Sequence, residues 1–377
     1  KFEKMFITIG KISYSLYLFH QPIFSFYKIY LYKNDIYESN LSKIYLVTIL
    51  FIISYLNYYF IEKKFLSSKK LINIKFFLIV YFLTAIVFFG FSSRNENLLK
   101  FNPYSNRLVI YSLKSQNIIQ QNNRSCENRK ISEICFFDTE STERKVYSLG
   151  DSSFRTISSF IEKEREDLQF DYFHFGGNGC LPLLYEKVAD ISCPENDVSE
   201  ISKFIESINN SIVIYGGRIP LYLSEEGFFN GIEREDTNIQ TLVNVEYEVR
   251  KVLEYLIRNN NQIILIYPIP TQGWNVPNLF FYEKFNWGDT VGYSYDLWRE
   301  RSSKSKDLLD SVQSSQISRV YPENIFCQEI VDNLCVGAYQ DKIFYSDDDH
   351  LSEEGAKLVS GLVIDEIRNI LNSKKDY

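Results

Sequence analysis

The fold is decided by one short stretch, VYSLGDSS at residues 146–153. Its first half is apolar and has the length of a buried strand, and the amphipathic pattern of residues 153–162 predicts a helix directly after it. Ser152 therefore lies at a strand-to-helix turn, where backbone N–H groups and the helix dipole favour a developing negative charge. Ser152 is a candidate nucleophile, although Gly-Asp-Ser is also a common turn sequence.

A second motif, SDDDHLS at residues 346–352, precedes the last predicted helix. Aspartate-rich loops often serve only as helix caps, so this motif alone is equally open to a structural explanation. A serine nucleophile needs an imidazole to take its proton and a carboxylate to orient that imidazole. Ser152, His350 and Asp347 together supply all three groups, in a sequence that has only three histidines.

From residue 145 onward, short apolar runs alternate with longer amphipathic stretches. This alternation predicts a parallel sheet covered by helices on both faces, which is a three-layer α/β domain over residues 145–377. In such domains, sites lie at the carboxyl ends of the strands, where Ser152 is placed. The predicted strands are 146–149, 170–175, 211–215, 262–267 and 318–320, and the predicted helices are 153–162, 198–208, 239–258, 293–312 and 352–371.

The first part of the chain has a membrane-like composition. Three apolar stretches, at residues 12–32, 44–60 and 72–91, have the length of membrane-spanning helices. The lysine-rich connector between the second and third stretches is cytoplasmic by the positive-inside rule, so the third helix leads out of the cytoplasm. Residues 1–95 are thus predicted to be a membrane part, and residues 96–144 a polar linker and lead-in to the outer domain.

Charge and cysteine content limit the function further. A net charge of −7 argues against a nucleic-acid partner. All six cysteines fall in the part predicted to lie outside the cytoplasm, and their even number suggests disulfides. Zinc is the weaker explanation because no Cys-x-x-Cys pair is present, and no metal site is predicted. The short spacings suggest the pairs Cys126–Cys135, Cys180–Cys193 and Cys327–Cys335.

Further candidate residues follow the other strands. In FGGNGC at residues 175–180, Gly177 either offers a backbone N–H to an oxyanion or belongs to a plain glycine turn. Arg218, in YGGR, has three possible roles: stabilising the oxyanion, binding a substrate hydroxyl, or forming an ion pair. His174 is expected in the core or at its rim. The aromatic-rich stretch 274–287 either stacks on sugars or packs on the core.

The Gly-Asp-Ser at residues 150–152 and the Asp-x-x-His at residues 347–350 resemble the first and last blocks of the SGNH hydrolases. The resemblance implies a flavodoxin-like fold, a triad of Ser152, Asp347 and His350, and an oxyanion hole that includes the backbone of Ser152 and Gly177. The SGNH pattern normally has an asparagine after the third strand. This chain has Arg218 in that region, which makes the third oxyanion-hole member a departure from the pattern.

The membrane part resembles a second family. GKISYSLYLFHQP at residues 10–22 and YFIEKKF at residues 59–65 are similar to the closing segments of the acyltransferase-3 (AT3) membrane domain. FYSDDDHLS at residues 344–352, preceded by the Cys327/Cys335 pair, is similar to the ending of the SGNH domains fused to AT3 proteins. The resemblance implies that the membrane part holds the last two AT3 helices and one extra helix.

This resemblance covers only the end of the AT3 membrane domain. The chain begins with Lys1, so we expect a fragment or a truncated reading frame. The acyl-handling residues of the family belong to earlier helices, and His20 is therefore not expected to be one of them. An ionisable residue within a membrane helix is a functional candidate by default, and a hydrogen bond that locks neighbouring helices is the alternative role for His20.

By resemblance, the protein is a multi-pass protein of the bacterial inner (cytoplasmic) membrane, with its C-terminal domain in the periplasm or outside the cell. Acetyl-coenzyme A is then the ultimate donor through the missing membrane half, and the SGNH domain itself binds no cofactor. That domain would pass acetyl through a serine ester to a hydroxyl of a surface polysaccharide such as lipopolysaccharide. The implied partners are this polysaccharide and the lipid bilayer. Two alternatives stay open: a carbohydrate esterase with water as acceptor, and a non-catalytic glycan-binding remnant.

Overall fold

The structure is a computed structural model of the whole chain, and its residues fall into two compact units, Lys1–Arg107 and Leu108–Tyr377. Each unit is described by itself. The structure describes residues 2–33, 40–63, 118–139, 144–184, 198–223, 239–277, 279 and 290–373.

The described part of the first unit is helical. It contains α1 (Phe2–Lys33), α2 (Asn40–Asn57) and a short π-helical continuation, η1 (Tyr58–Glu62). Among the described residues, the one stretch long and apolar enough to cross a membrane is Leu41–Phe60, judged by length and composition alone. α1 covers the first predicted span without meeting that criterion, because polar residues interrupt its apolar sequence. The third predicted span, 72–91, lies outside the described residues.

A small polar cluster joins α1 to the end of α2. The Asn57 side-chain amide donates to the Ser15 hydroxyl oxygen (2.8 Å) and to Oε1 of Glu62 (3.1 Å), and the Ser15 hydroxyl donates to the same Glu62 oxygen. His20 does not take part in this cluster. Its Nδ1 lies 2.6 Å from the carbonyl oxygen of Tyr17, one turn earlier in the same helix. This hydrogen bond of His20 therefore lies within α1, and the link to a neighbouring helix stays a prediction.

The second unit is built on a six-stranded sheet with the order β3-β5-β4-β6-β7-β9. β3 is antiparallel to β5, and all the other neighbours are parallel. In chain order the five parallel strands run 2-1-3-4-5, which is the flavodoxin-like order. The predicted parallel α/β fold is thus confirmed. The strands are β3 (Cys135–Phe137), β4 (Lys145–Asp151), β5 (Asp171–Gly177), β6 (Ile212–Tyr215), β7 (Gln262–Ile266) and β9 (Ile317–Val320).

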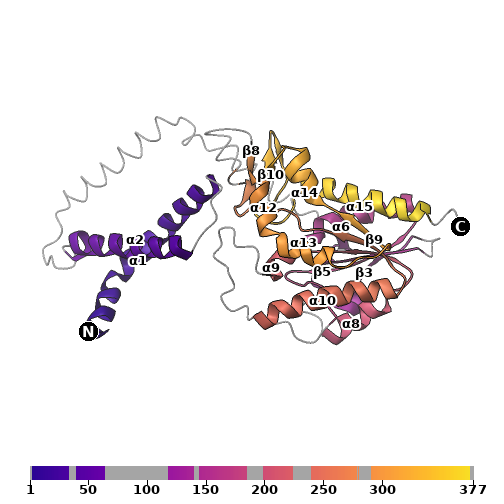
Figure 1. The fold of residues 1–377 in the computed structure, drawn as a ribbon, viewed down its shortest axis with the longest axis horizontal. Coiled ribbons are helices and arrows are strands. Elements are labelled where there is room, and N and C mark those ends of the chain that lie inside the picture. The colour runs from indigo at the N-terminus through magenta and orange to yellow at the C-terminus, as the bar shows by residue number, and fades with distance from the viewer. Residues whose placement is uncertain are drawn as a thin grey trace. The chain divides into compact units, whose positions relative to one another are not determined.

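Helices cover both faces of this sheet (Figure 1). On one face, α6 (Phe154–Lys163) packs against α15 (Glu353–Ser373), and on the other α8 (Val198–Ser207) packs against α10 (Ile239–Arg258). Because parallel strands between two helical layers are buried on both faces, β6 is buried throughout. Three shorter helices complete the α layers: α7 (Arg165–Leu168), α9 (Ile219–Tyr222) and α13 (Ser303–Asp310).

The predicted helix over 293–312 is wrong in its first part. Residues Thr290–Ser294 form β8, and the helix starts only at α12 (Tyr295–Arg301), where the Ser294 hydroxyl accepts the Leu297 N–H (3.4 Å) as an N-terminal cap. β8 pairs antiparallel with β10 (Leu334–Tyr339) in a three-stranded sheet. The other small elements are β11 (Lys342–Ile343), β1 (Gln120–Gln121), β2 (Arg124–Ser125), η2 (Ile131–Glu133), α14 (Pro322–Asn324) and η3 (Ile325–Glu329).

Two of the three predicted disulfides are present among the described residues, Cys126–Cys135 and Cys327–Cys335. Cys180 is disulfide-bonded as well, and its predicted partner, Cys193, lies outside the described residues. The first disulfide lies ahead of residue 145, in the same segment as β3. The sheet therefore starts earlier than the predicted beginning of the domain, because part of the lead-in forms its edge.

Candidate active site

Ser152 lies where the sequence places it, in the turn between the end of β4 and the start of α6. The switch point of a flavodoxin-like sheet, between its first and third strands, falls between β4 and β6 in this chain. Ligands of such sheets bind outside the carboxyl ends of the strands at this point. Ser152 and Arg218 follow these two strands, and Gly177 ends β5 beside them.

A buried carboxylate holds the turn of Ser152 in place. Asp151 is 2% exposed, and its Oδ1 accepts the backbone N–H (3.0 Å) and the hydroxyl (2.6 Å) of Ser153. Its Oδ2 accepts the backbone N–H of Arg218 (2.7 Å) and the hydroxyl of Tyr222 (3.0 Å). Four donors thus satisfy the charge in the interior, and they fix the turn after β4 to the loop after β6.

The three residues predicted to form a triad are in contact. The Ser152 hydroxyl oxygen lies 2.9 Å from Nε2 of His350, and Nδ1 of His350 lies 2.8 Å from Oδ2 of Asp347. Because Nδ1 faces a carboxylate, it carries a proton, and in the neutral ring Nε2 is then the acceptor for the serine proton. The other oxygen of Asp347 accepts the backbone N–H groups of Asp349 (3.0 Å) and His350 (2.7 Å). The carboxylate is therefore fixed on both sides.

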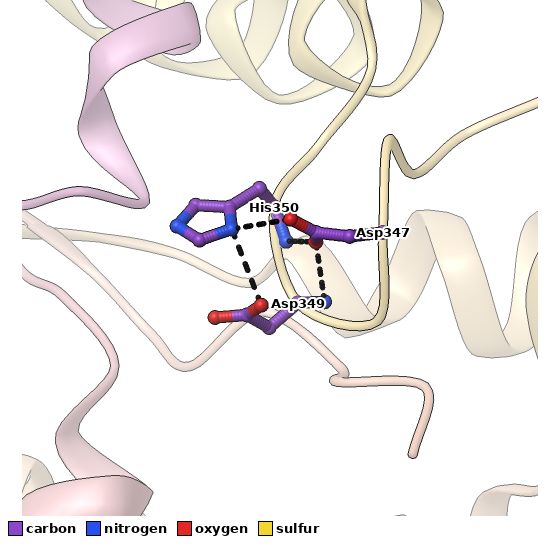
Figure 2. Close-up of side chains that lie close together, drawn as sticks. All are labelled: Asp347, Asp349 and His350. Atoms are coloured by element: carbon purple, nitrogen blue, oxygen red, sulfur yellow. Dashed lines mark hydrogen bonds and ion pairs between the residues drawn. The ribbon is translucent and has the colours of Figure 1, made fainter. Parts of the chain in front are cut away.

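A second carboxylate faces the same ring nitrogen. Oδ1 of Asp349 lies 3.2 Å from Nδ1 of His350, and its Oδ2 forms an ion pair with the guanidinium of Arg218. Figure 2 shows both carboxylates on one side of the imidazole, with the other ring nitrogen pointing away from them. Sequence reasoning missed Asp349. The only trace of its role in the sequence is that the motif before His350 has a third aspartate.

These contacts shift the pKa values of His350 and of the neighbouring carboxyl groups. Burial alone lowers the pKa of His350, but the hydrogen bonds and charges of Asp347 and Asp349 outweigh burial and hold the pKa well above its ordinary value. Burial raises the pKa of Asp347, yet the hydrogen bonds from His350 hold the pKa of this carboxyl far below its usual range. Burial, followed by the charges of its two aspartate neighbours, raises the pKa of Asp348. The two carboxylates therefore favour the protonated imidazole.

The comparisons with known proteins identify the domain. Residues 120–365 match the family model described as the SGNH domain fused to AT3 domains. The chain belongs to this family. None of the curated proteins matches the sequence.

Two solved structures are similar to this chain at low identity. One is the periplasmic domain of a lipopolysaccharide acetyltransferase from Salmonella ser. Paratyphi A, with 14% identity and a TM-score of 0.42 over 72% of this chain and 99% of that one. The other is an acetyl xylan esterase, with 13% identity and a TM-score of 0.32 over 59% of this chain and 98% of that one. The family assignment rests on the matched model.

The SGNH domain holds its glycine loop with residues from the lead-in. Gly177 lies in register with Asp151 across the β4–β5 pair. Asn128 packs against this loop: its N–H donates to the carbonyl of Gly176 (2.9 Å), and its side-chain oxygen accepts the N–H of Asn178 (2.8 Å). A β-carbon on Gly177 would lie 2.4 Å from that side-chain oxygen, so any larger residue here would have to displace the Asn128 side chain.

Arg218 forms an ion pair, which is one of the three roles considered for it. Its guanidinium pairs with Asp349, and its backbone N–H donates to Asp151. His174 is a core residue, 1% exposed, with Nε2 3.4 Å from Oε1 of Glu127. Most of the aromatic-rich stretch 274–287 lies outside the described residues.

The loop after β7 holds the loop that carries His350, and sequence reasoning missed this contact. The backbone N–H of Gln272 donates to the carbonyl of Asp348 (2.6 Å), and that of Val276 donates to the carbonyl of Asp347 (3.0 Å). At the other end of the loop that carries His350, the Ser352 hydroxyl accepts the N–H of Gly355 (3.3 Å) and caps the last helix. The loop that carries His350 is thus fixed at both of its ends.

Asp347, Asp349 and His350 also have the composition of a metal site, with candidate ligand atoms within 4.8 Å of one another. Their existing contacts fit a base and its acids better. The ring nitrogen that would bind a metal faces both carboxylates, and the Arg218 guanidinium places a positive charge on Asp349. A cation among these groups would have to displace hydrogen bonds and approach an arginine.

Proposed function

We propose that the SGNH domain transfers an acyl group, acetyl in the first instance, through an ester on Ser152 to a hydroxyl of a carbohydrate. The observation that carries the proposal is the line of contacts from the Ser152 hydroxyl through His350 to Asp347, at 2.9 Å and 2.8 Å. This arrangement of nucleophile, base and orienting acid is the one that serine acyl transfer needs, whatever the fold that carries it.

In the first half-reaction, the Ser152 oxygen attacks the carbonyl carbon of the acyl donor as its proton moves to Nε2 of His350. Asp347 stabilises the imidazolium that forms. As the tetrahedral intermediate breaks down, Nε2 returns the proton to the departing donor oxygen. The donor alcohol leaves, and the acyl group remains as an ester on Ser152.

The negative oxygen of the intermediate needs donors that are already in place. The backbone N–H groups of Ser152 and Gly177 are the candidates, because both residues end neighbouring parallel strands at the same edge of the sheet. Arg218 takes a different role in this proposal. With its guanidinium on Asp349, it acts on the base rather than directly on the oxyanion.

In the second half-reaction, an acceptor hydroxyl gives its proton to Nε2 of His350 and attacks the ester. The acceptor leaves acylated, and Ser152 recovers its proton from the imidazolium. A surface polysaccharide such as lipopolysaccharide is the proposed acceptor. The supporting observations are the family's fusion to AT3 domains and the AT3-like segments at residues 10–22 and 59–65.

The proposed location is outside the cytoplasm, with the chain held in the bacterial inner membrane. The disulfides of the SGNH domain support this, because such bonds persist in oxidising compartments. The apolar stretch Leu41–Phe60 supports membrane attachment. Acetyl-coenzyme A is the proposed ultimate donor, through the AT3 part, and the SGNH domain is proposed to need no cofactor of its own.

The test uses the full chain in detergent with p-nitrophenyl acetate as donor, with and without an oligosaccharide acceptor. Acetylated oligosaccharide supports transfer, whereas acetate alone supports an esterase. We expect Ser152→Ala to abolish p-nitrophenol release and the acetyl-serine adduct in mass spectra of the intact protein. Ser159→Ala is the matched control, because that hydroxyl donates only to a carbonyl within α6 (2.8 Å). Full activity in Ser152→Ala would overturn the proposal, and inactivity of the unaltered chain would favour a non-catalytic domain.

A further inference from the structure

The imidazole of His350 is held by two carboxylates rather than one. Asp347 approaches Nδ1 to 2.8 Å and Asp349 approaches it to 3.2 Å (Figure 2). One N–H shared between two acceptors limits rotation of the ring more than a single acceptor does. The second contact comes from the residue next to the histidine, so the backbone of the loop fixes its position.

Asp349 is not simply an additional charge in the loop. Its side chain is 9% exposed, and the oxygen that does not face His350 pairs with the guanidinium of Arg218. The backbone N–H of Arg218 in turn donates to the buried Asp151, beside the nucleophile. A continuous line of polar contacts therefore runs from the turn of Ser152, through the loop after β6, to the base.

We propose that Asp349 is a second positioning residue for His350, and that Arg218 sets how strongly its charge acts on the base. This inference rests on the proposed function, because it assigns Asp349 and Arg218 to the same reaction. In this arrangement Arg218 is the counter-ion of Asp349.

The charges around the imidazole predict whether each variant raises or lowers the pKa of His350. Asp347 and Asp349 face it from its own loop, with Asp348 between them in sequence. Asp151 ends β4, Ser152 follows it, and Arg218 lies on the loop after β6. Each carboxylate favours the protonated imidazole, and Arg218 weakens the effect of Asp349. Removing Asp349 therefore lowers the pKa of His350, and removing Arg218 raises it.

The test is whether removing Asp349 and removing Arg218 shift the pKa of His350 in opposite directions. The variants Asp349→Asn and Arg218→Gln are made in the full chain in detergent, and kcat/KM for p-nitrophenyl acetate is measured against pH. We expect the acid limb of the profile to move to lower pH by about one unit in Asp349→Asn. In Arg218→Gln it moves to higher pH, and in the double variant it follows Asp349→Asn. Arg218→Lys keeps the positive charge and returns the limb towards that of the unaltered chain.

A second measurement does not depend on activity. Selective carbon-13 labelling of histidine gives three ring signals, because the chain has three histidines. His20→Gln and His174→Gln assign them, and the titration midpoint of His350 is read directly. If the unaltered chain is inactive but the midpoint moves in opposite directions in the two variants, the proposed function fails and the positioning role stands.

The matched control is Asp348→Asn, which removes the same charge from the same loop without removing a hydrogen bond to the imidazole. We expect a smaller shift there than in Asp349→Asn. Midpoints and acid limbs that move the same way in Asp349→Asn and Arg218→Gln would overturn the inference, since general loosening of the loop predicts a common direction. An unchanged midpoint in Asp349→Asn would overturn it as well.

Discussion

The hydroxyl of Ser152 and Nε2 of His350 lie 2.9 Å apart, although 198 positions separate the two residues in the chain. The first residue follows the central strand of the sheet and the second precedes its last helix. Their contact depends on the intervening fold: the buried Asp151 holds the turn of Ser152, and the loop after β7 holds the loop of His350.

Asp347→Asn removes the charge that stabilises the imidazolium but keeps an oxygen for the backbone N–H groups of Asp349 and His350. We therefore expect the protein to stay folded while kcat for ester hydrolysis falls by about 10⁴-fold, as it does when a triad aspartate becomes an amide. Steady-state kinetics with p-nitrophenyl acetate measure this. A loss of less than tenfold would show that Asp347 is not the principal orienting acid.

Asp151→Asn should destabilise the SGNH domain. Each carboxylate oxygen accepts two donors, and an amide nitrogen in place of either oxygen would meet two donors instead of accepting them. We expect a loss of about 3 kcal/mol in unfolding free energy, from hydrogen bonds to a buried charge. Denaturant unfolding followed by tryptophan fluorescence measures it. Ser211→Ala, which removes one hydroxyl contact with a local carbonyl (2.7 Å), should cost far less.

Gly177→Ala should displace the glycine loop. The added methyl would meet the side-chain oxygen of Asn128 at 2.4 Å and break its bond to the N–H of Asn178. We expect a loss of hydrolytic activity that Asn128→Gly partly restores in the double variant, since this change removes the clashing side chain at a position whose φ is 56°. The same activity in the single and double variants would mean that the clash is relieved in another way.

The pair formed by Asp347 and His350 should make stability depend on pH. The folded pKa of His350 lies above its ordinary value of 6.5, so its contribution is complete below pH 6.5 and is lost as pH rises through the raised pKa. The folded pKa of Asp347 lies below its ordinary value of 3.8, so its contribution is complete above pH 3.8 and is lost as pH falls further.

Thermal unfolding midpoints from pH 4 to pH 10 test this dependence, because the two contributions coexist at about pH 4 to 6.5. The unaltered chain should become less stable above that range. His350→Gln should flatten this alkaline decline relative to the unaltered chain. An equally steep decline in the variant would assign the effect to other groups.

Much of the central sheet and its helices could be predicted because each element leaves a local pattern in the sequence. Buried parallel strands are short apolar runs, and α10 begins and ends at the predicted residues, Ile239 and Arg258. β8 could not be predicted in this way. Its pairing partner, β10, lies about 40 residues later, and the amphipathic stretch that contains β8 also suits a helix. Only the tertiary pairing and the cap at Ser294 decide between the two.

The site likewise has residues that local motifs predict and residues that only distant contacts bring into place. Ser152, Asp347 and His350 stand in short motifs, so their contact could be predicted. Asp349 gains its place through Arg218, 131 positions away, and Asn128 reaches the glycine loop from a segment that the sequence suggested was mostly linker. Neither contact leaves a periodic pattern in the chain, because each depends on one side chain meeting one distant loop.

The separation of nucleophile and base has a consequence for how the protein matures. A growing chain contains Ser152 and its turn long before the loop of Asp347 and His350 has been made. Until that loop docks beside β4, Ser152 lacks the imidazole that the proposed reaction needs to accept its proton. In the proposed mechanism, the order of synthesis thus delays acylation of Ser152 until the sheet and the last helix have come together.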